Sequence, residues 1–299
     1  MNRCVRAWLA GAVVVASPSA AWADDEVGAT TTVEPTPTAK PGPFAISPIG
    51  DTAVIALSGG FAGVLDLVMT TGEIRPQQIS PNFDSRQLLG IDRGAISQEV
   101  EGSAGTLSNV GVGVALAFAV VDPILTGFRE ENATSALVDA TLYVETFTIT
   151  LAITNIAKVA VRRPRPAAYV AAEAHRNDPS YTNTDTDSSL SFFSGHTSTT
   201  AALTATATYL AFVRSPKTAR PWITLTSGAA LTAFVGFERV RAGKHFPTDV
   251  IAGALAGAGV GLVVPHLHRT EAPRATVGAV PVVTERGTTG GVLTLSGTF

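Results

Sequence analysis

Long apolar segments alternate with short polar stretches through most of the chain. They are rich in Ala, Leu, Val and Gly, and Gly, Pro and Asp clusters separate them, which is typical of helices too long to be strands. The pattern therefore predicts an all-α fold, a six-helix bundle forming one domain over residues 48–270. The segments cover roughly residues 52–69, 108–127, 137–160, 198–213, 222–237 and 249–265.

The pattern changes after Pro273 to an alternation of apolar and polar residues. It runs through residues 277–284 and 292–298, with the Gly-rich residues 287–291 between them. This indicates a short β-hairpin in the C-terminal tail, residues 271–299, with Pro281 restricting the first strand to an edge.

The N-terminus has the features of a secretory signal. Arg3 and Arg6 precede an apolar stretch over residues 7–16, and Ala21-Trp22-Ala23 provides small residues at a cleavage site. The sequence therefore predicts a signal peptide over residues 1–23 and an exported protein. An uncleaved anchor is disfavoured, because the apolar stretch is shorter than a bilayer requires.

Composition narrows the possible partners. Residues 24–47 are rich in Pro and Thr and predict a flexible linker. Without residues 1–23 the chain keeps 19 basic residues against 24 acidic ones, so no broad basic surface is available for nucleic acid. The single cysteine, Cys4, lies in the predicted signal, so the mature chain has no disulfides.

Acidic residues in the apolar segments argue against a membrane-spanning bundle. Each central carboxylate would cost about 2–3 kcal/mol on insertion into lipid. The first three segments contain Asp66, Asp122, Asp139 and Glu145. We therefore expect a periplasmic bundle that is soluble or peripherally attached to the membrane.

The last segment supports the alternative of an integral membrane protein with six spans. Residues 250–264 are uniformly apolar. Gly253, Gly257 and Gly261 recur at four-residue spacing, which suits close helix packing in lipid as well as in a protein core.

Three clusters of basic residues and histidines carry the candidate chemistry. A lysine and an arginine around a helix end offer a point charge and a planar fork to the oxygens of one phosphoryl group. A Ser-Gly pair before a helix offers an N-cap and free backbone N–H groups to an anion. The clusters are Lys158 with Arg165-Pro166, then Ser194-Gly195-His196, then Arg239 with His245 and Asp249.

Written as K-x6-R-P, S-G-H and R-x5-H-x3-D, the clusters resemble the signature of the type 2 phosphatidic acid phosphatase (PAP2) superfamily. This superfamily includes bacterial class A acid phosphatases, lipid phosphatases and vanadium haloperoxidases. The resemblance implies that His245 is the nucleophile, that His196 is the general acid and that Asp249 orients His245. It also implies that five residues bind the substrate phosphate: Lys158, Arg165, Ser194, Gly195 and Arg239.

The resemblance also bears on the side of the membrane that the site would face. A cleaved signal leaves the new N-terminus outside, so three spans would place Lys158 on the cytoplasmic side. The exported lipid phosphatases usually have their site on the opposite side, which is a second argument for a periplasmic bundle.

Two positions depart from the superfamily pattern. Phe193 replaces the usual Pro and is expected to add bulk at the pocket rim. Glu238 replaces the usual Ser, and its charge is expected to raise the pKa of a neighbouring histidine. Arg162 and Arg163 have no role in the pattern and are expected at the surface. Residues 169–191 are predicted to form a loop, either a lid over the pocket or a tolerated surface loop.

The expected function is metal-independent hydrolysis of phosphate monoesters, lipid or small and soluble, through a phosphohistidine. The partner is a phosphorylated small molecule or lipid phosphate, with possible membrane association and no nucleic acid. A vanadium haloperoxidase is an alternative and would need vanadate, the one cofactor considered; a non-catalytic anion- or lipid-binding module is another. His266 and His268 lack a ligand set in the sequence, so no metal site is predicted.

Overall fold

The computed structural model describes residues 42–80, 82–270, 276–284 and 287–296. The predicted signal peptide and nearly all of the predicted linker lie outside these residues. All six apolar segments are helices, and the all-α fold class is confirmed. They are α1 (Pro48–Thr70), α2 (Gly102–Arg129), α3 (Ala133–Val161), α5 (Gly195–Arg214), α6 (Arg220–Arg241) and α7 (Pro247–Leu267).

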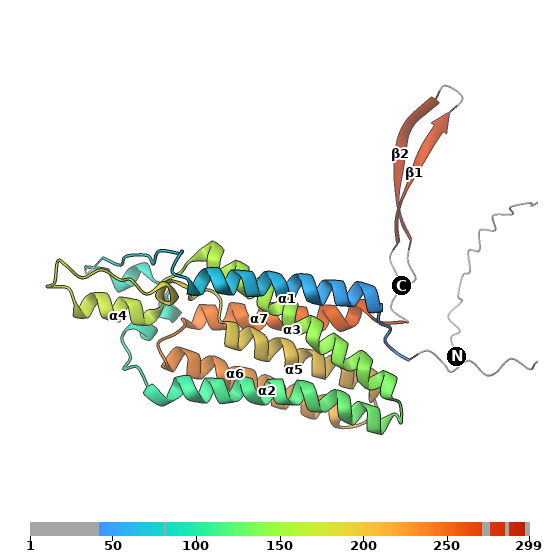
Figure 1. The fold of residues 1–299 in the computed structure, drawn as a ribbon, viewed down its shortest axis with the longest axis horizontal. Coiled ribbons are helices and arrows are strands. Elements are labelled where there is room, and N and C mark those ends of the chain that lie inside the picture. The colour runs from blue at the N-terminus through green and yellow to red at the C-terminus, as the bar shows by residue number, and fades with distance from the viewer. Residues whose placement is uncertain (1–41, 81, 271–275, 285–286, 297–299) are drawn as a thin grey trace, which may run out of the picture. The chain divides into compact units, whose positions relative to one another are not determined.

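Further short helices lie in the connections at one end of the bundle (Figure 1). Helix α4 (Pro166–Ala174) occupies the start of the stretch predicted as a loop, because Pro166 favours a first helical turn and an Ala-rich sequence continues it. The 3₁₀ helices are η1 (Ser85–Gln87), η2 (Gly90–Ile96) and η3 (Thr186–Ser189).

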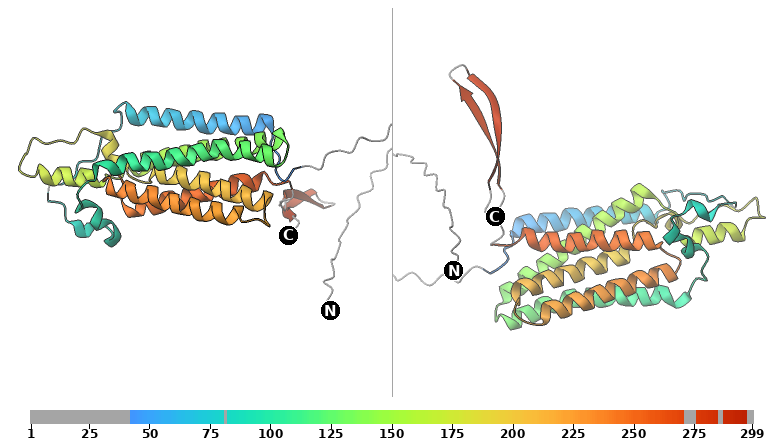
Figure 2. Two further views of the ribbon diagram at one scale, coloured as in Figure 1. Left: turned by 90° about the horizontal axis from the view of Figure 1, so that it is seen from below. Right: turned by 180° about the vertical axis from the view of Figure 1, so that it is seen from behind.

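Helix α5 lies at the centre of the bundle and contacts α2, α3, α6 and α7 (Figure 2). Most of its residues are buried although many are threonines. The hydroxyls of Thr200, Thr204 and Thr208 each donate to a carbonyl one turn earlier, at 2.8–2.9 Å. These polar side chains are satisfied within their own helix, so they can be buried without a desolvation penalty.

The glycines of α7 bring this helix against the backbone of α5. A Cβ atom on Gly257 would lie 2.0 Å from the carbonyl oxygen of Ser198. Equivalent atoms on Gly253 and Gly261 would lie 2.7 Å and 2.2 Å from the carbonyl oxygens of Ser194 and Ala202. The predicted role of this glycine spacing in close helix packing is confirmed.

The bundle begins before residue 48. Phe44 is buried in the core, and its backbone forms an antiparallel β-bridge with Arg269. The Ser47 side chain accepts a hydrogen bond from the Gly50 amide at the start of α1. The last residues of the predicted linker are therefore part of the folded domain.

The outer surface of the bundle is strongly apolar. Within the described part of the chain, four helical stretches are long and apolar enough to cross a membrane: α1, α2, α3 with α4, and α7. Their large apolar side chains point outward; Leu57 is 74% exposed and Leu255 is 71% exposed. This surface supports membrane association, and it does not support our preference for a soluble bundle.

Two of the acidic residues that argued against a membrane are paired with arginines. Asp122 and Asp139 are buried and pair with Arg220 and Arg214 at 2.9 Å and 2.6 Å. Asp66 lines a cavity together with Lys158. Glu145 is also buried in the bundle. Insertion costs for isolated charges therefore do not apply to Asp122 and Asp139.

The predicted hairpin is present, with strands β1 (Thr276–Thr284) and β2 (Gly287–Ser296) paired antiparallel. Residues 287–291, predicted as its turn, instead form the first half of β2, and Pro281 pairs with Gly291. The strands are separated by residues 285–286 alone, which is a common length for a hairpin connection.

Candidate active site

The three clusters converge at the end of the bundle where α3 ends and α5 and α7 begin. A Cβ atom on Gly195 would lie 3.7 Å from the Lys158 Nζ. Lys158, Gly195 and His196 line one cavity of about 490 Å³. The first two clusters, 36 residues apart between Lys158 and Ser194, thus form one site.

The turn after α3 positions Lys158 and Arg165. Helix α3 ends where Arg162 adopts a left-handed conformation with φ of 51°, two residues before Pro164. Arg165 then precedes α4, and its backbone N–H donates to the Ser188 carbonyl at 2.7 Å. The Arg165 side chain is buried, and its guanidinium forms an ion pair with Asp187. Its Nε has no hydrogen-bond partner among the described residues.

Arg239 has few polar partners for a buried cation. Its side chain is buried near the end of α6. Among the hydrogen bonds of the described residues, its guanidinium makes a single contact, with the Ser108 Oγ at 3.4 Å. A buried guanidinium with so few partners is costly unless an anion completes its environment. The position of Arg239 therefore suits an oxyanion clamp.

The N-terminus of α5 presents the second cluster. Ser194 is the N-cap, as predicted, and its Oγ accepts the Thr197 N–H at 3.4 Å. The Ser194 N–H, however, donates to the Asp249 carbonyl at 3.1 Å, so it is not free for a substrate, contrary to our expectation. Gly195 is the first helical residue, and its amide has no partner within the helix. The His196 Nε2 lies 2.7 Å from the Asn109 Oδ1.

His245 is held by a backbone carbonyl and not by a carboxylate. It is 2% exposed, and its Nδ1 lies 2.7 Å from the Ser191 carbonyl oxygen. Because a carbonyl can only accept, Nδ1 carries the hydrogen of the neutral ring and Nε2 keeps the lone pair. Burial, followed by the charges of Arg165, Arg239 and Lys158, holds the pKa of His245 well below its ordinary value. The ring is therefore held in the neutral form, with the lone pair on Nε2.

Asp249 acts on His245 indirectly. One carboxylate oxygen, Oδ2, accepts from the Ser191 Oγ at 2.5 Å and from the Phe246 N–H at 2.9 Å, while Oδ1 accepts from Arg163 at 2.5 Å. Asp249 therefore fixes Ser191, which holds the imidazole, and Phe246, which follows it. Asp249 thus does not contact His245 directly, and as the third residue of α7 it accepts the backbone N–H of the N-cap residue Phe246.

Arg163 is part of the site and not a surface residue. Its side chain bridges Asp249 and the fully buried Asp92, at 2.5 Å and 2.8 Å, and lies over the Phe246 ring. The sequence did not predict that Ser191 and Asp92 support the site. Arg163 falls within the spacer of the first cluster, to which the pattern assigns no role, and neither Ser191 nor Asp92 belongs to a motif.

The two departures from the superfamily pattern behave differently from expectation. Glu238 is buried and accepts from Arg241 at 3.2 Å and 3.3 Å, so its charge is paired. The pKa of His245 is lowered, the opposite of the predicted effect. Phe193 is buried against α7, 3.5 Å from the Cβ position of Gly253, and not on an exposed rim.

The stretch before the second cluster is tied to the segment after α1. The Gln77 N–H donates to the Ser189 Oγ at 2.8 Å, and the Asn183 N–H donates to the Gln78 side chain at 2.9 Å. Asp187 contacts Arg165, one of the predicted phosphate ligands. The stretch is thus joined to the site through Asp187.

Comparison with known proteins gives a family match for the segment that carries the site. Residues 139–273 match the PAP2 superfamily, which confirms the resemblance of the three clusters and supports a phosphatase-type enzyme. A solved structure described as the first transmembrane PAP2 type phosphatidylglycerolphosphate phosphatase, from Bacillus subtilis, is similar at 18% identity and a TM-score of 0.42. The similarity covers 72% of this chain and 93% of that one. No curated protein matches the chain.

Proposed function

We propose that this chain is a membrane-embedded phosphatase that hydrolyses a lipid phosphate monoester through a phosphohistidine. The observation that carries the proposal is the convergence of Lys158, Arg165 and Arg239 on a buried, neutral His245. Simple anion binding needs the cations alone, whereas a neutral imidazole with a free Nε2 lone pair supplies a nucleophile.

The reaction proceeds in two displacements. The Nε2 of His245 attacks phosphorus in line, the P–O bond to the alcohol breaks, and His196 gives the leaving oxygen its proton. Lys158, Arg165 and Arg239 neutralise the charge on the equatorial oxygens. Water, deprotonated by His196, then attacks phosphorus, the P–N bond breaks, and phosphate leaves with His245 neutral again.

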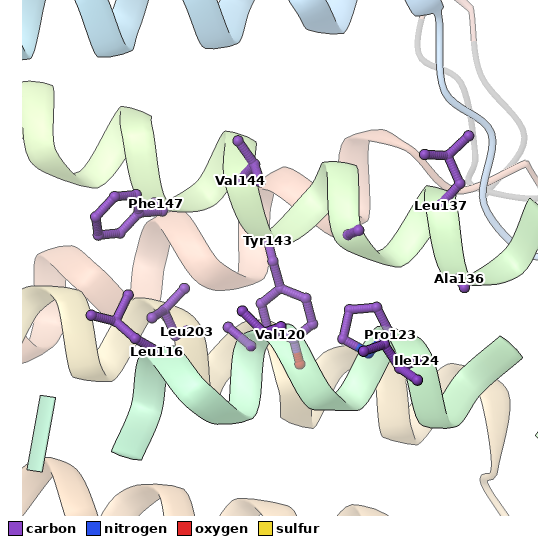
Figure 3. A pocket seen from close by; sticks show the side chains of 12 residues that line it. Leu116, Val120, Pro123, Ile124, Ala136, Leu137, Tyr143, Val144, Phe147 and Leu203 are labelled. Atoms are coloured by element: carbon purple, nitrogen blue, oxygen red, sulfur yellow. The ribbon is translucent and has the colours of Figure 1, made fainter. Parts of the chain in front are cut away.

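An apolar groove next to the site supports a lipid substrate. It lies between α2 and α3, has a volume of about 540 Å³ and is lined almost entirely by apolar side chains (Figure 3). Leu116 and Phe147 line both this groove and the cavity at Lys158 and His196. A phosphate bound at the site can therefore place an attached hydrocarbon chain along α2 and α3.

The distribution of apolar side chains supports six spans, α1, α2, α3, α5, α6 and α7. Helix α6 carries exposed Trp222, Ile223 and Phe237. Helix α5 is less apolar, but the other helices surround it, so its threonines do not face lipid. Its place in the bundle explains why α5 lacks the hydropathy of a lipid-facing span.

Phosphate release by the full chain in detergent tests the activity. We expect turnover of phosphatidic acid and a loss of at least about a thousandfold in His245→Ala with the bundle still folded. ³²P from labelled substrate should remain on the wild-type chain after a base quench and disappear after an acid quench, as a phosphoramidate requires. Unchanged turnover in His245→Ala would refute the assigned nucleophile.

A pair of substitutions on α2 tests the groove. Ala119 lines it, whereas Ala117 is exposed and lies outside it. We expect Ala119→Phe to lower kcat/KM about tenfold or more for a long-chain phosphatidic acid, and to leave a dihexanoyl analogue unaffected, since only long chains reach the groove. Ala117→Phe should change neither. Equal loss on both substrates in Ala119→Phe would contradict a chain-binding role.

A further inference from the structure

A second cluster of ionisable residues lies away from the phosphatase site. Asp51 is in the first turn of α1, Glu145 is in the middle of α3, and His268 follows the last residue of α7. Glu145 and Lys158 are 13 residues apart on α3, which corresponds to about 20 Å along the helix. The cluster therefore cannot contact a phosphate bound at the catalytic site.

The imidazole of His268 faces two carboxylates. Its Nε2 lies 3.4 Å from the Asp51 Oδ1 and 3.3 Å from the Glu145 Oε2. The other ring nitrogen, Nδ1, lies 2.8 Å from the Val264 carbonyl oxygen and therefore donates its hydrogen there. In the neutral ring, the Nε2 lone pair then points toward two negative oxygens, an arrangement that calls for a positive charge between them.

Glu145 provides an independent indication of a missing partner. The residue is 6% exposed, and its Oε2 is buried without a hydrogen-bond partner among the described residues. Buried carboxylate oxygens are rarely left unpaired, because the desolvation cost is large. The unpaired oxygen is the one that faces His268.

The spacing of the three atoms fits a metal ion. All three lie within 4.8 Å of one another. Ligands at about 2.0–2.1 Å from a tetrahedral zinc ion are about 3.3 Å apart, which matches both distances from the His268 Nε2. One imidazole with two carboxylates suits a borderline ion of the zinc class better than magnesium, which prefers oxygen ligands alone.

Neighbouring groups hold the three ligands in place. The Ser47 N–H donates to the second oxygen of Asp51 at 2.8 Å, and the Ala45 N–H donates to the His268 carbonyl at 2.9 Å. With the hydrogen bond from His268 to Val264, these contacts form the supporting shell that metal ligands usually have.

We propose that Asp51, Glu145 and His268 bind one divalent cation of the zinc class, which joins α1 to α3 and α7. The site is structural, because it lies far from the reacting groups, and it is independent of the proposed phosphatase activity. The sequence predicted no metal for His266 and His268. Tertiary structure separates the two histidines: His266 hydrogen-bonds to the Tyr209 hydroxyl, while His268 acquires two carboxylates from distant helices.

Metal content and thermal stability of the full chain in detergent, purified without a polyhistidine tag, test the proposal. We expect one zinc per chain in the wild type and in the control His266→Gln, and less than a tenth of that in Glu145→Gln and His268→Gln. Chelation should lower the unfolding midpoint of the wild type by several degrees, zinc should restore it, and the midpoint of Glu145→Gln should not respond.

Two outcomes would overturn the proposal. One is a wild-type chain that neither retains nor takes up stoichiometric zinc and whose midpoint ignores chelation. The other is full zinc binding by His268→Gln. If the variants fail to fold, the response of the wild-type unfolding midpoint to chelation and to added zinc decides whether the site binds a metal.

Discussion

The contact between α5 and α7 predicts opposite changes in stability when two neighbouring glycines of α7, Gly257 and Gly259, are replaced by alanine. In Gly257→Ala the new methyl would lie 2.0 Å from the Ser198 carbonyl oxygen, about 1.4 Å closer than ordinary contact. Overpacking of this kind costs about 1–3 kcal/mol, and a backbone neighbour favours the upper end, because a carbonyl cannot rotate away as a side chain can. The gain in helix propensity returns up to about 1 kcal/mol.

The net loss of about 2 kcal/mol corresponds to a fall of about 4–8 °C in the unfolding midpoint for a domain of this size. Gly259→Ala is the matched control, since a Cβ at Gly259 meets nothing within 4 Å. It should raise the midpoint by about 2–4 °C through propensity alone.

Thermal unfolding of both variants in the same detergent, followed by circular dichroism, measures the difference. Gly257→Ala should also lose turnover, because α5 and α7 carry His196 and Asp249 at the facing ends of their first turns. If Gly257→Ala is as stable as Gly259→Ala, the close approach of the two helices is wrong.

Further predictions concern the nucleophile and its supports. Asp249→Asn presents an amide to groups that are all donors, so we expect a loss of about 2–4 kcal/mol in stability and about 10–100-fold in kcat. Ser191→Ala keeps the backbone carbonyl that holds His245, so we expect it to lower kcat far less than Asp249→Asn does. Equal losses of kcat in the two variants would mean that the hydrogen bond from the Phe246 N–H to Asp249 does not contribute to activity. Because the pKa of His245 is lowered, the acidic limb of kcat/KM against pH should fall below about 6.5, and a limb at or above that value would contradict a buried neutral imidazole. As the pH falls, His245 takes up a proton in the unfolded chain before it does so in the folded protein. The neutral buried histidine therefore contributes fully to the free energy of unfolding above about pH 6.5, and this contribution is lost as the pH falls below that value. In His245→Gln, the free energy of unfolding measured against pH should lack this loss.

Local patterns in the sequence were enough for the helices and for the chemistry of the three clusters. Apolar runs separated by Gly, Pro and Asp fold as helices wherever they are packed, so all six were predicted within a few residues. Ser194 caps α5 because capping depends on the next three residues alone. His196 and His245 could be selected as candidates because the spacing within each cluster is short.

Only the tertiary structure decided how these residues are supported. Arg163 and Ser191 bind Asp249, and the Ser191 carbonyl holds His245. Asp92 in turn binds Arg163 and Thr248. Spacing in the sequence does not predict these contacts, because the residues come from separate segments. The apolar outer surface was decided in the same way, because the charges of Asp122 and Asp139 count against a membrane only until Arg220 and Arg214 are found beside them.

The same division holds for the zinc-class site. The sequence by itself determined that His268 ends an apolar helix, which is a local property of the chain. The two carboxylates that face it lie 217 and 123 residues earlier, and only packing of α1, α3 and α7 brings them within ligand distance. Side-chain type and helical periodicity are local, whereas the electrostatic environment of a buried group is the sum of neighbours that folding assembles.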